Sequence, residues 1–329
     1  MFVFGLVQVL VVIKRKTKQM NKPLTCLLAL TFLFLFSGSV YGQEEVKKEY
    51  WDNGKLKREE PYNGIVTSYY ESGEKKEEVH LKNGKLEGLR TGWYETGEKE
   101  FEVHYKNGKF EGLATGWYKT GEKEFEVHYK NGKLEGLRTG WYETGEKEFE
   151  VHYKNGKEEG LRTDWYETGG KKVESYYKNG KLEGLETEWD KTGRKLWATH
   201  YKNDKKEGPE TIWYESGIKN SEIHYKNGKR EGLRTGWYKS GKIEYKGFYK
   251  NGKREGPGTS WYEFGQKRGE SHWKNGKRDG VYKEWYKSGK KKLLKHYKNG
   301  IENGIRKEWD EDGKLKFEGN YVDGAEEIK

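Results

Sequence analysis

The chain has 329 residues, of which 36% are charged, 45 are glycine and only 32% are apolar. This composition excludes a compact globular core of ordinary size, while an aromatic content of 15% excludes a disordered chain. The formal charge of +11 is not gathered into a block of like charge, because Lys and Glu alternate along most of the sequence, so we expect no nucleic-acid partner.

Residues 1–42 have the pattern of a leader that carries a secretory signal peptide. An unbroken run of apolar and small residues extends from Leu24 to Phe36, after Lys22 and before a short segment of small residues. Cleavage after Gly42 would lower the formal charge to +6, because the leader holds five Lys or Arg residues and no acid. We therefore expect a secreted protein or one of the cell envelope, in the periplasm or at the outer membrane.

Two alternatives concern the same segment. Met20 is an alternative start, and the run from Leu24 to Tyr41 could stay uncleaved as a membrane anchor. Cys26 is the only cysteine and lies in the leader, so the mature chain is expected to hold neither a disulfide nor a thiolate metal site.

After irregular half-repeats at 43–63, a 24-residue repeat fills residues 64–329. Series of glycines at this spacing mark the period. In one of them the glycine follows Asn or Asp, from Gly84 to Gly324, and this series is broken only at Asp204. Self-similarity at this period predicts about eleven stacked units, each burying its apolar face against its neighbours. The most regular glycines, usually preceded by Thr or Ser, are Gly73, Gly97, Gly121, Gly145, Gly169, Gly193, Gly217, Gly241, Gly265, Gly289 and Gly313.

Residues 88–111 show what one unit forms. The unit reads GLRTGWYETGEKEFEVHYKNGKFE and alternates with period two in both halves, as strands rich in β-branched and aromatic residues do. Each unit is therefore predicted to be one β-hairpin. The fold class that follows is all-β: an elongated single-sheet array of about eleven stacked hairpins.

The position of the turn decides which side chains share a face. A three-residue loop at Thr96–Glu98, with its glycine at positive φ, would pair Trp93 with Phe101 and bring the apolar side chains to one face. A two-residue loop would instead set Phe101 opposite Gly92, so the three-residue loop is preferred. The second turn, Lys106–Lys109, is expected to be longer and to pass the chain to the next hairpin.

Ten of the thirteen tryptophans occupy a single phase of the repeat, with Tyr69 at the head of the column. In the predicted register they form the structural core of the sheet. They are Trp93, Trp117, Trp141, Trp165, Trp189, Trp213, Trp237, Trp261, Trp285 and Trp309.

Two segments resemble the consensus of MORN repeats, the membrane-occupation-and-recognition-nexus motif: Tyr245–Gly258 (YKGFYKNGKREGPG) and Phe317–Gly324 (FEGNYVDG). More closely, WYETG followed by YKNGKLEG is similar to the bacterial MORN variant whose members are often labelled YwqK-family antitoxins. The resemblance covers roughly residues 50–329 and implies an elongated sheet of successive hairpins. Most units carry Glu where the typical motif has His before the glycine.

All eight histidines also share one phase and are expected to form a ladder. Successive members would lie two strand spacings apart, about 10 Å, too far for two of them to hold one metal ion. We therefore expect no metal site and no cofactor, and a pH-sensitive surface is the functional alternative. The ladder comprises His80, His104, His128, His152, His200, His224, His272 and His296.

A column of tyrosines directly follows the tryptophans and is predicted to face the opposite way. Such an aromatic stripe could bind glycans, peptides or lipid headgroups through its rings, or could only cover the second face of the sheet. The candidate binding stripe comprises Tyr94, Tyr118, Tyr142, Tyr166, Tyr214, Tyr238, Tyr262 and Tyr286.

The sequence does not favour catalysis, because Ser, His and acidic residues recur with the repeat and none is unique. We expect a non-enzyme that acts as an extended interaction scaffold for an unidentified protein partner. One alternative is antitoxin-like neutralisation of a cognate toxin, which only the resemblance implies. The other is binding to a cell-wall glycan or a lipid surface.

Overall fold

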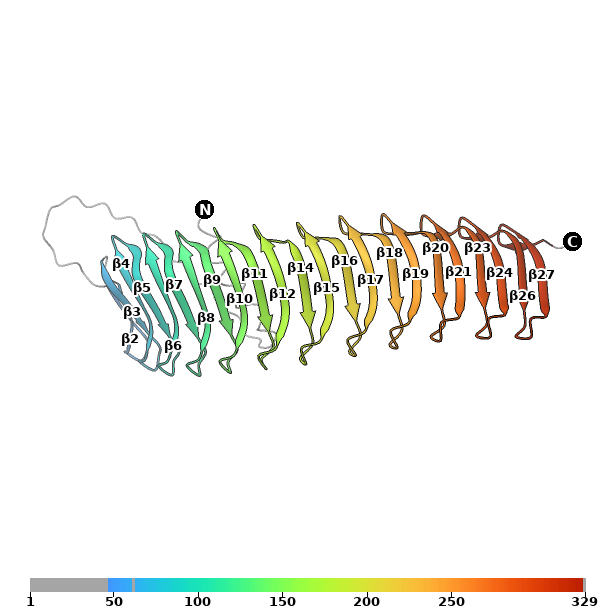
Figure 1. Cartoon of the computed structure of the whole chain (residues 1–329). Coiled ribbons are helices and arrows are strands. Elements are labelled where there is room, and N and C mark those ends of the chain that lie inside the picture. Colours follow the sequence, from blue (N-terminus) through green and yellow to red (C-terminus); the bar gives the residue numbers. More distant parts are fainter. Residues whose placement is uncertain (1–46, 61–62, 328–329) are drawn as a thin grey trace. The chain divides into compact units, whose positions relative to one another are not determined.

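A computed structural model describes residues 47–60 and 63–327, which form one antiparallel sheet of 28 strands (Figure 1). The strands pair in chain order, so the sheet is a continuous meander from β1 to β28. Within these described ranges no helix is long and apolar enough to cross a membrane. The predicted leader, residues 1–42, lies outside the described residues.

Each 24-residue unit supplies two long strands, and this confirms the predicted array of hairpins; β6 has eight residues and β7 has nine. The first fourteen strands are β1 (Lys47–Tyr50), β2 (Leu56–Glu60), β3 (Gly64–Tyr69), β4 (Lys75–Lys82), β5 (Lys85–Trp93), β6 (Lys99–Lys106), β7 (Lys109–Trp117), β8 (Lys123–Lys130), β9 (Lys133–Trp141), β10 (Lys147–Lys154), β11 (Lys157–Trp165), β12 (Lys171–Lys178), β13 (Lys181–Leu182) and β14 (Gly184–Trp189). The remaining strands are β15 (Lys195–Lys202), β16 (Lys205–Trp213), β17 (Lys219–Lys226), β18 (Lys229–Trp237), β19 (Ile243–Lys250), β20 (Lys253–Trp261), β21 (Lys267–Lys274), β22 (Lys277–Arg278), β23 (Gly280–Trp285), β24 (Lys291–Lys298), β25 (Ile301–Glu302), β26 (Gly304–Trp309), β27 (Leu315–Val322) and β28 (Ala325–Glu326).

The turn between successive hairpins is tight, so the prediction of a longer connection was wrong. Lys106 pairs directly with Lys109, and the two residues between them, Asn107 and Gly108, have φ angles of 51° and 74°. Positive φ at both central residues is the requirement of a two-residue type I′ turn, which Asn-Gly meets at low cost. We call the side of the sheet formed by these turns the Asn–Gly edge.

The connection inside each hairpin is a three-residue loop, but it starts one residue earlier than predicted. The Tyr94 N–H donates to the Glu98 carbonyl, and the Gly97 N–H donates to the Tyr94 carbonyl, both at 2.9 Å. The loop therefore comprises residues 95–97, and Gly97 has a φ of 98°. We call the side formed by these loops the loop edge.

This one-residue difference, together with a β-bulge between Gly92 and Trp93, changes the register of the hairpin. Phe101 pairs with Gly92 instead of Trp93, and Val103 pairs with Arg90. The physical reason lies in the glycine, because a Cβ at Gly92 would stand 2.6 Å from the Phe101 Cζ. The missing side chain makes room for the ring, and the same pairing recurs in the next two hairpins.

Because directly paired side chains point to the same side of a sheet, the register divides the molecule into two faces. The Val face carries the columns of Phe101, Val103 and Tyr105. The Trp face carries the columns of Leu89 and Trp93. The most enclosed apolar cluster lies on the Val face and consists of Val103, Tyr105, Ala114 and Val127, with Leu86, Phe101, Phe110, Phe125, Tyr129 and Leu134 packed against it.

Candidate functional site

The ten tryptophans that were predicted to form the core do form a column, but each is only half-buried. They lie on the face opposite the enclosed cluster, as the corrected register requires. In most repeats the indole ring lies under a lysine side chain of the preceding repeat. The Lys99 Nζ, for example, stands 5.8 Å from the Trp117 ring centroid and also forms an ion pair with Glu102. The column is therefore a half-open layer under a cover of ion pairs.

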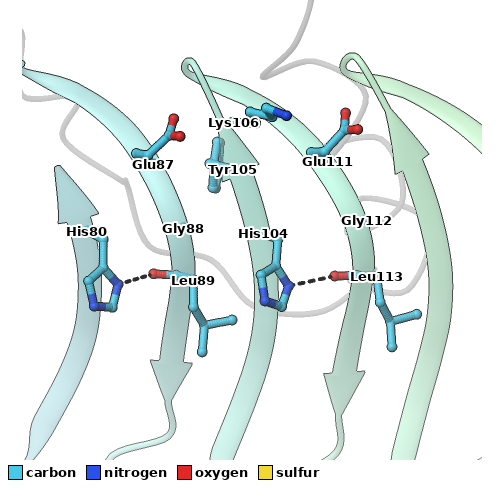
Figure 2. Close-up of a pocket in the computed structure, with 10 residues that line it drawn as sticks. All are labelled: His80, Glu87, Gly88, Leu89, His104, Tyr105, Lys106, Glu111, Gly112 and Leu113. Carbon is cyan, nitrogen blue, oxygen red and sulfur yellow. Dashed lines mark hydrogen bonds between the residues drawn. The ribbon is translucent and has the colours of Figure 1, made fainter. Parts of the chain in front are cut away.

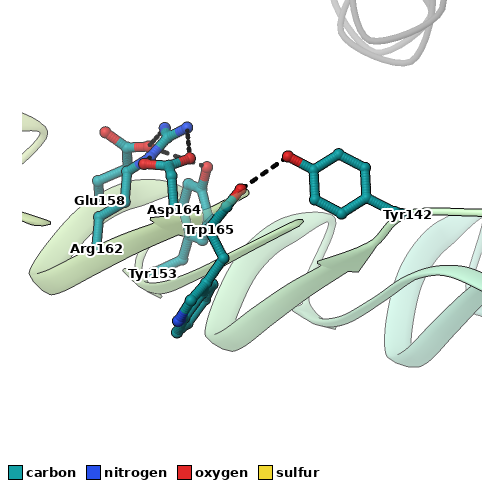
Figure 3. A network of polar contacts seen from close by, with 6 residues as sticks. All are labelled: Tyr142, Tyr153, Glu158, Arg162, Asp164 and Trp165. Atoms are coloured by element: carbon teal, nitrogen blue, oxygen red, sulfur yellow. Dashed lines mark hydrogen bonds and ion pairs between the residues drawn. The ribbon is translucent and has the colours of Figure 1, made fainter. Parts of the chain in front are cut away.

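The tyrosines of the predicted binding stripe are half-buried and lie at the loop edge. Each hydroxyl donates a hydrogen bond of 2.7–2.9 Å to the main-chain carbonyl of the tryptophan in the next repeat, as Figure 3 shows for Tyr142 and Trp165. This Tyr ladder joins neighbouring hairpins. A binding role for the stripe stays a prediction, and the contact that the structure gives these hydroxyls is internal.

Burial raises the pKa of Tyr94 and of Tyr118 to about 12, and nearby carboxylates such as Glu124 add to the effect. The charged phenolate is disfavoured because it would lose water and face like charge. Both hydroxyls therefore remain hydrogen-bond donors throughout the neutral range.

A second ladder joins the repeats at the Asn–Gly edge. A Glu87 carboxylate oxygen accepts from the Asn107 N–H at 2.6 Å, and the Leu86 carbonyl accepts from the Gly108 N–H at 2.8 Å. The acid before the repeat glycine thus caps the next turn. The same bond to the next turn is made by Glu111, Glu135, Glu159, Glu183, Glu207, Glu231, Glu255 and Asp279.

A row of exposed aliphatic and ring side chains crosses the Trp face, and sequence reasoning missed it. In every hairpin but the last an apolar residue pairs directly with a ring residue, as Leu113 does with His128 and Leu161 with Tyr176, whereas Ile305 of the last hairpin pairs with Asn320. Ten of the sixteen large apolar side chains that are exposed in the described part of the chain belong to this row, so it is the main apolar surface there. We call it the Leu–His row; it comprises Ile65, His80, Leu89, His104, Leu113, His128, Leu137, His152, Leu161, Tyr176, Leu185, His200, Pro209, His224, Leu233, Phe248, Pro257, His272, Val281, His296 and Ile305.

Three imidazoles of the row, those of His80, His104 and His296, share one geometry, which Figure 2 shows for the first two. The His80 Nδ1 lies 2.7 Å from the Leu89 carbonyl oxygen, and the His296 Nδ1 lies 2.8 Å from that of Ile305. The Nδ1 must donate there, which leaves Nε2 to face outward. A shallow depression lies between the first two rings of the row and is lined by His80, Leu89, His104 and Leu113. Over residues 47–60 and 63–327, no cluster of three metal-ligating side chains occurs.

The Val face carries polar networks where the Gly–Phe pair is replaced. Asp164 stands in the glycine position, and both of its carboxylate oxygens accept from Arg162 at 2.9 Å. This bidentate contact raises the pKa of Arg162. Figure 3 shows the network on the side of the sheet opposite the Trp165 ring, which agrees with the division into two faces.

The Trp face presents apolar side chains next to imidazole rings, each of which can form one hydrogen bond with a ligand through its Nε2 atom. Leu161 is 50% exposed and Phe248 is 45% exposed, although both lie in the middle of regular strands. A row of exposed apolar side chains is typical of a surface that binds another macromolecule. The periodic arrangement suits a long ligand better than a small one.

Comparison with known proteins gives a family. Two crystal structures overlap with this chain. The TcdB2-TccC3-Cdc42 structure is 11% identical, with 87% of this chain and 16% of that chain covered and a TM-score of 0.18. The TcdB2-TccC3-TEV structure is 12% identical, with 84% and 16% covered and a TM-score of 0.15. The chain thus spans about a sixth of the length of those chains, and no curated protein matches it.

The family model described as MORN repeat variant matches most of the chain. Its eleven matches lie at residues 46–63, 62–83, 86–107, 110–131, 134–155, 158–179, 206–227, 230–251, 254–275, 278–299 and 302–323. The matches follow the 24-residue period of the hairpins and leave only residues 180–205 uncovered between the first match and the last apart from short gaps, and the chain belongs to the family of MORN repeat variant proteins.

Proposed function

We propose that this chain is a non-enzymatic scaffold, secreted or associated with the cell envelope, that binds a protein partner along the Leu–His row. The observation that carries the proposal is the exposure of ten large apolar side chains along that row. A monomeric soluble protein rarely leaves so long an apolar line open to water without a partner.

The chemistry of the row favours a protein over a glycan. Its members are aliphatic side chains and imidazoles, whereas the tyrosine hydroxyls that would recognise a sugar donate to main-chain carbonyls of the sheet. The envelope location rests on the signal-peptide pattern of residues 1–42. A mature N-terminus at Gln43, read by mass spectrometry of the fractionated protein, is the expected result.

The binding role can be tested by affinity capture from the native host followed by chemical cross-linking. A variant with Leu113, Leu137 and Leu161 changed to Ser removes exposed apolar groups from three successive hairpins. A matched control changes exposed loop-edge residues of the same three hairpins, Lys119→Ser, Glu143→Ser and Glu167→Ser.

We expect the wild-type chain and the control to retain the same protein, and the row variant to lose it. Equal retention by the row variant would refute the proposal. The antitoxin alternative would be favoured if the retained protein were toxic when expressed alone and silenced by this chain.

A further inference from the structure

Lysines line the Asn–Gly edge beside the Leu–His row. Two of them flank almost every turn, and all are exposed. Within the described residues, none of them forms an ion pair or a side-chain hydrogen bond. We call this set the lysine row; it comprises Lys82, Lys85, Lys106, Lys109, Lys130, Lys133, Lys154, Lys157, Lys178, Lys181, Lys202, Lys205, Lys226, Lys229, Lys250, Lys253, Lys274, Lys277 and Lys298.

The two rows are contiguous on one face. Lys106 follows His104 by two positions on β6, so both side chains point to the Trp face about 7 Å apart along the strand. Figure 2 shows Lys106 between Glu87 and Glu111, whose carboxylates cap the following turns. Two lysines against one acid leave about one positive charge per repeat at this edge.

The opposite flank of the Leu–His row is electrically balanced. Glu102 lies next to the Leu–His row on its loop-edge side and forms an ion pair with Lys99. The same ion pair recurs in most hairpins. A partner that lies on the row therefore has the lysine row directly beside it on one side and ion-paired lysines of the Lys99 type on the other. Charge complementarity then requires acidic side chains along that one side of the partner.

The spacing of the row limits the backbone of the partner. Successive units are two strands apart, about 9.6 Å. An extended strand covers this distance in three residues, so its side chains would change sides at every unit. A seven-residue segment of α-helix rises about 10.5 Å and brings the same face back within about 20°.

A polyproline II segment also repeats at about 9.3 Å but offers one side chain in three residues. Each unit of the row presents two contact groups, for example Leu113 and His128. The two apolar positions of each α-helical heptad match the two contact groups of each unit. A polyproline II segment offers only one side chain per unit and does not match them.

On the basis of the proposed function, we infer that the Leu–His row binds an acidic amphipathic α-helix lying across the strands, with one heptad for each 24-residue repeat. The apolar heptad positions contact the Leu–His row, and acidic residues on one flank contact the lysine row. The mismatch of about 1 Å per repeat adds up to about 6 Å over seven repeats, and the long flexible stems of the lysine row take it up. The drift of about 20° per heptad requires the helix to wind along the sheet over the same length.

The probe for this inference is a synthetic acidic peptide of about seven heptads, with Leu at positions a and d and Glu at e and g. Repulsion between its own Glu residues keeps it from pairing with itself at neutral pH, so helix gain reports binding. A peptide this long cannot avoid the two central turns of the array. We therefore test Lys178, Lys181, Lys202 and Lys205, each changed to Gln, in the full chain.

We expect the labelled peptide to bind the wild-type chain, measured by fluorescence anisotropy, and to gain helix in far-UV circular dichroism. The four substitutions should weaken binding about tenfold, the combined effect of four exposed ion pairs. The charge-matched control changes the same number of exposed loop-edge lysines to Gln and should bind like the wild type. It carries K239Q, K242Q, K287Q and K314Q.

Three results would overturn the inference. Equal binding of a peptide with the same composition but shuffled Leu positions would remove the heptad match. Tighter binding of a proline-rich acidic peptide would replace the helix with a polyproline II segment. No binding of any probe would exclude an acidic helix, while the capture experiment with the Leu113, Leu137 and Leu161 variant would still decide separately whether the row binds a protein.

Discussion

Changing Gly140 to Ala tests the register that divides the sheet into its two faces. Gly140 pairs with Phe149, and an added Cβ would stand 2.6 Å from the ring Cζ and 2.8 Å from Cδ1. Ordinary contacts of this kind are 3.4–4 Å, so the ring must retreat by about 1 Å. Gly140 does not have a positive φ, so the substitution adds no backbone strain.

Two opposing effects set the change in the free energy of unfolding that Gly140→Ala causes. Overpacking of this kind costs about 1–3 kcal/mol, whereas replacing Gly by Ala at a compatible position gains about 0.4–1 kcal/mol from the unfolded state. We expect a net loss of about 1–2 kcal/mol in the free energy of unfolding. In a Phe149→Leu background the clash is relieved, and Gly140→Ala should then be neutral or slightly stabilising.

The assay is urea denaturation of the four proteins of this double-mutant cycle, with hydrogen exchange over residues 136–153 as the local readout. Gly121→Ala is the contrast, because Gly121 has a φ of 89° and open space around its Cβ position. Its cost of about 1–2 kcal/mol comes from the left-handed backbone and should not depend on Phe149. If Gly140→Ala cost nothing in the wild-type background, Phe149 could not face Gly140 and the register would be refuted.

Removing one hydroxyl from the Tyr ladder by Tyr118→Phe should cost about 0.5–1.5 kcal/mol in urea denaturation, while the exposed Tyr176→Phe should cost nothing measurable. Glu111→Ala should cost a similar amount, because it leaves an N–H of the next Asn–Gly turn without its acceptor; an unchanged midpoint would count against that cap. Because folding raises the pKa of Tyr94 and Tyr118 from about 10 to about 12, their contribution is complete below pH 10 and should be lost as pH rises toward 12; a double Phe variant should show a smaller alkaline loss. Deleting residues 92–139 removes two repeats across identical flanking sequences and should leave a folded sheet of lower stability, checked by circular dichroism and thermal unfolding.

The hairpin array could be predicted from the sequence, because the 24-residue period and the alternation of side chains depend only on local order. The register of the two strands within each hairpin could not be predicted from local order alone. Placing every apolar side chain on one face favours Trp93 opposite Phe101, but a large ring needs an empty position across from it, and Gly92 supplies that. The Asn-Gly dipeptide is the signal for the other connection, since a two-residue type I′ turn at 107–108 joins β6 to β7 with Lys106 opposite Lys109.

The candidate site followed from the same error. The predicted register places Leu89 on the buried face, so the aliphatic side chains of the Leu–His row become part of the core and the tyrosines become the exposed stripe. The Tyr and Glu ladders could not be predicted from pattern alone, because each joins atoms 20 or more residues apart through main-chain groups. Their repetition in nearly every unit explains why these residues recur so regularly in the sequence.

The claim that the Leu–His row is the binding surface can be tested most directly by site-specific photo-cross-linking in the native host. A photoreactive amino acid would replace Leu137 in the row and, as the matched control on the same hairpin, Glu143 at the loop edge. We predict a discrete protein adduct from position 137 that is absent from position 143. Adducts of equal yield from both positions, or none from position 137 while position 143 reacts, would contradict the account.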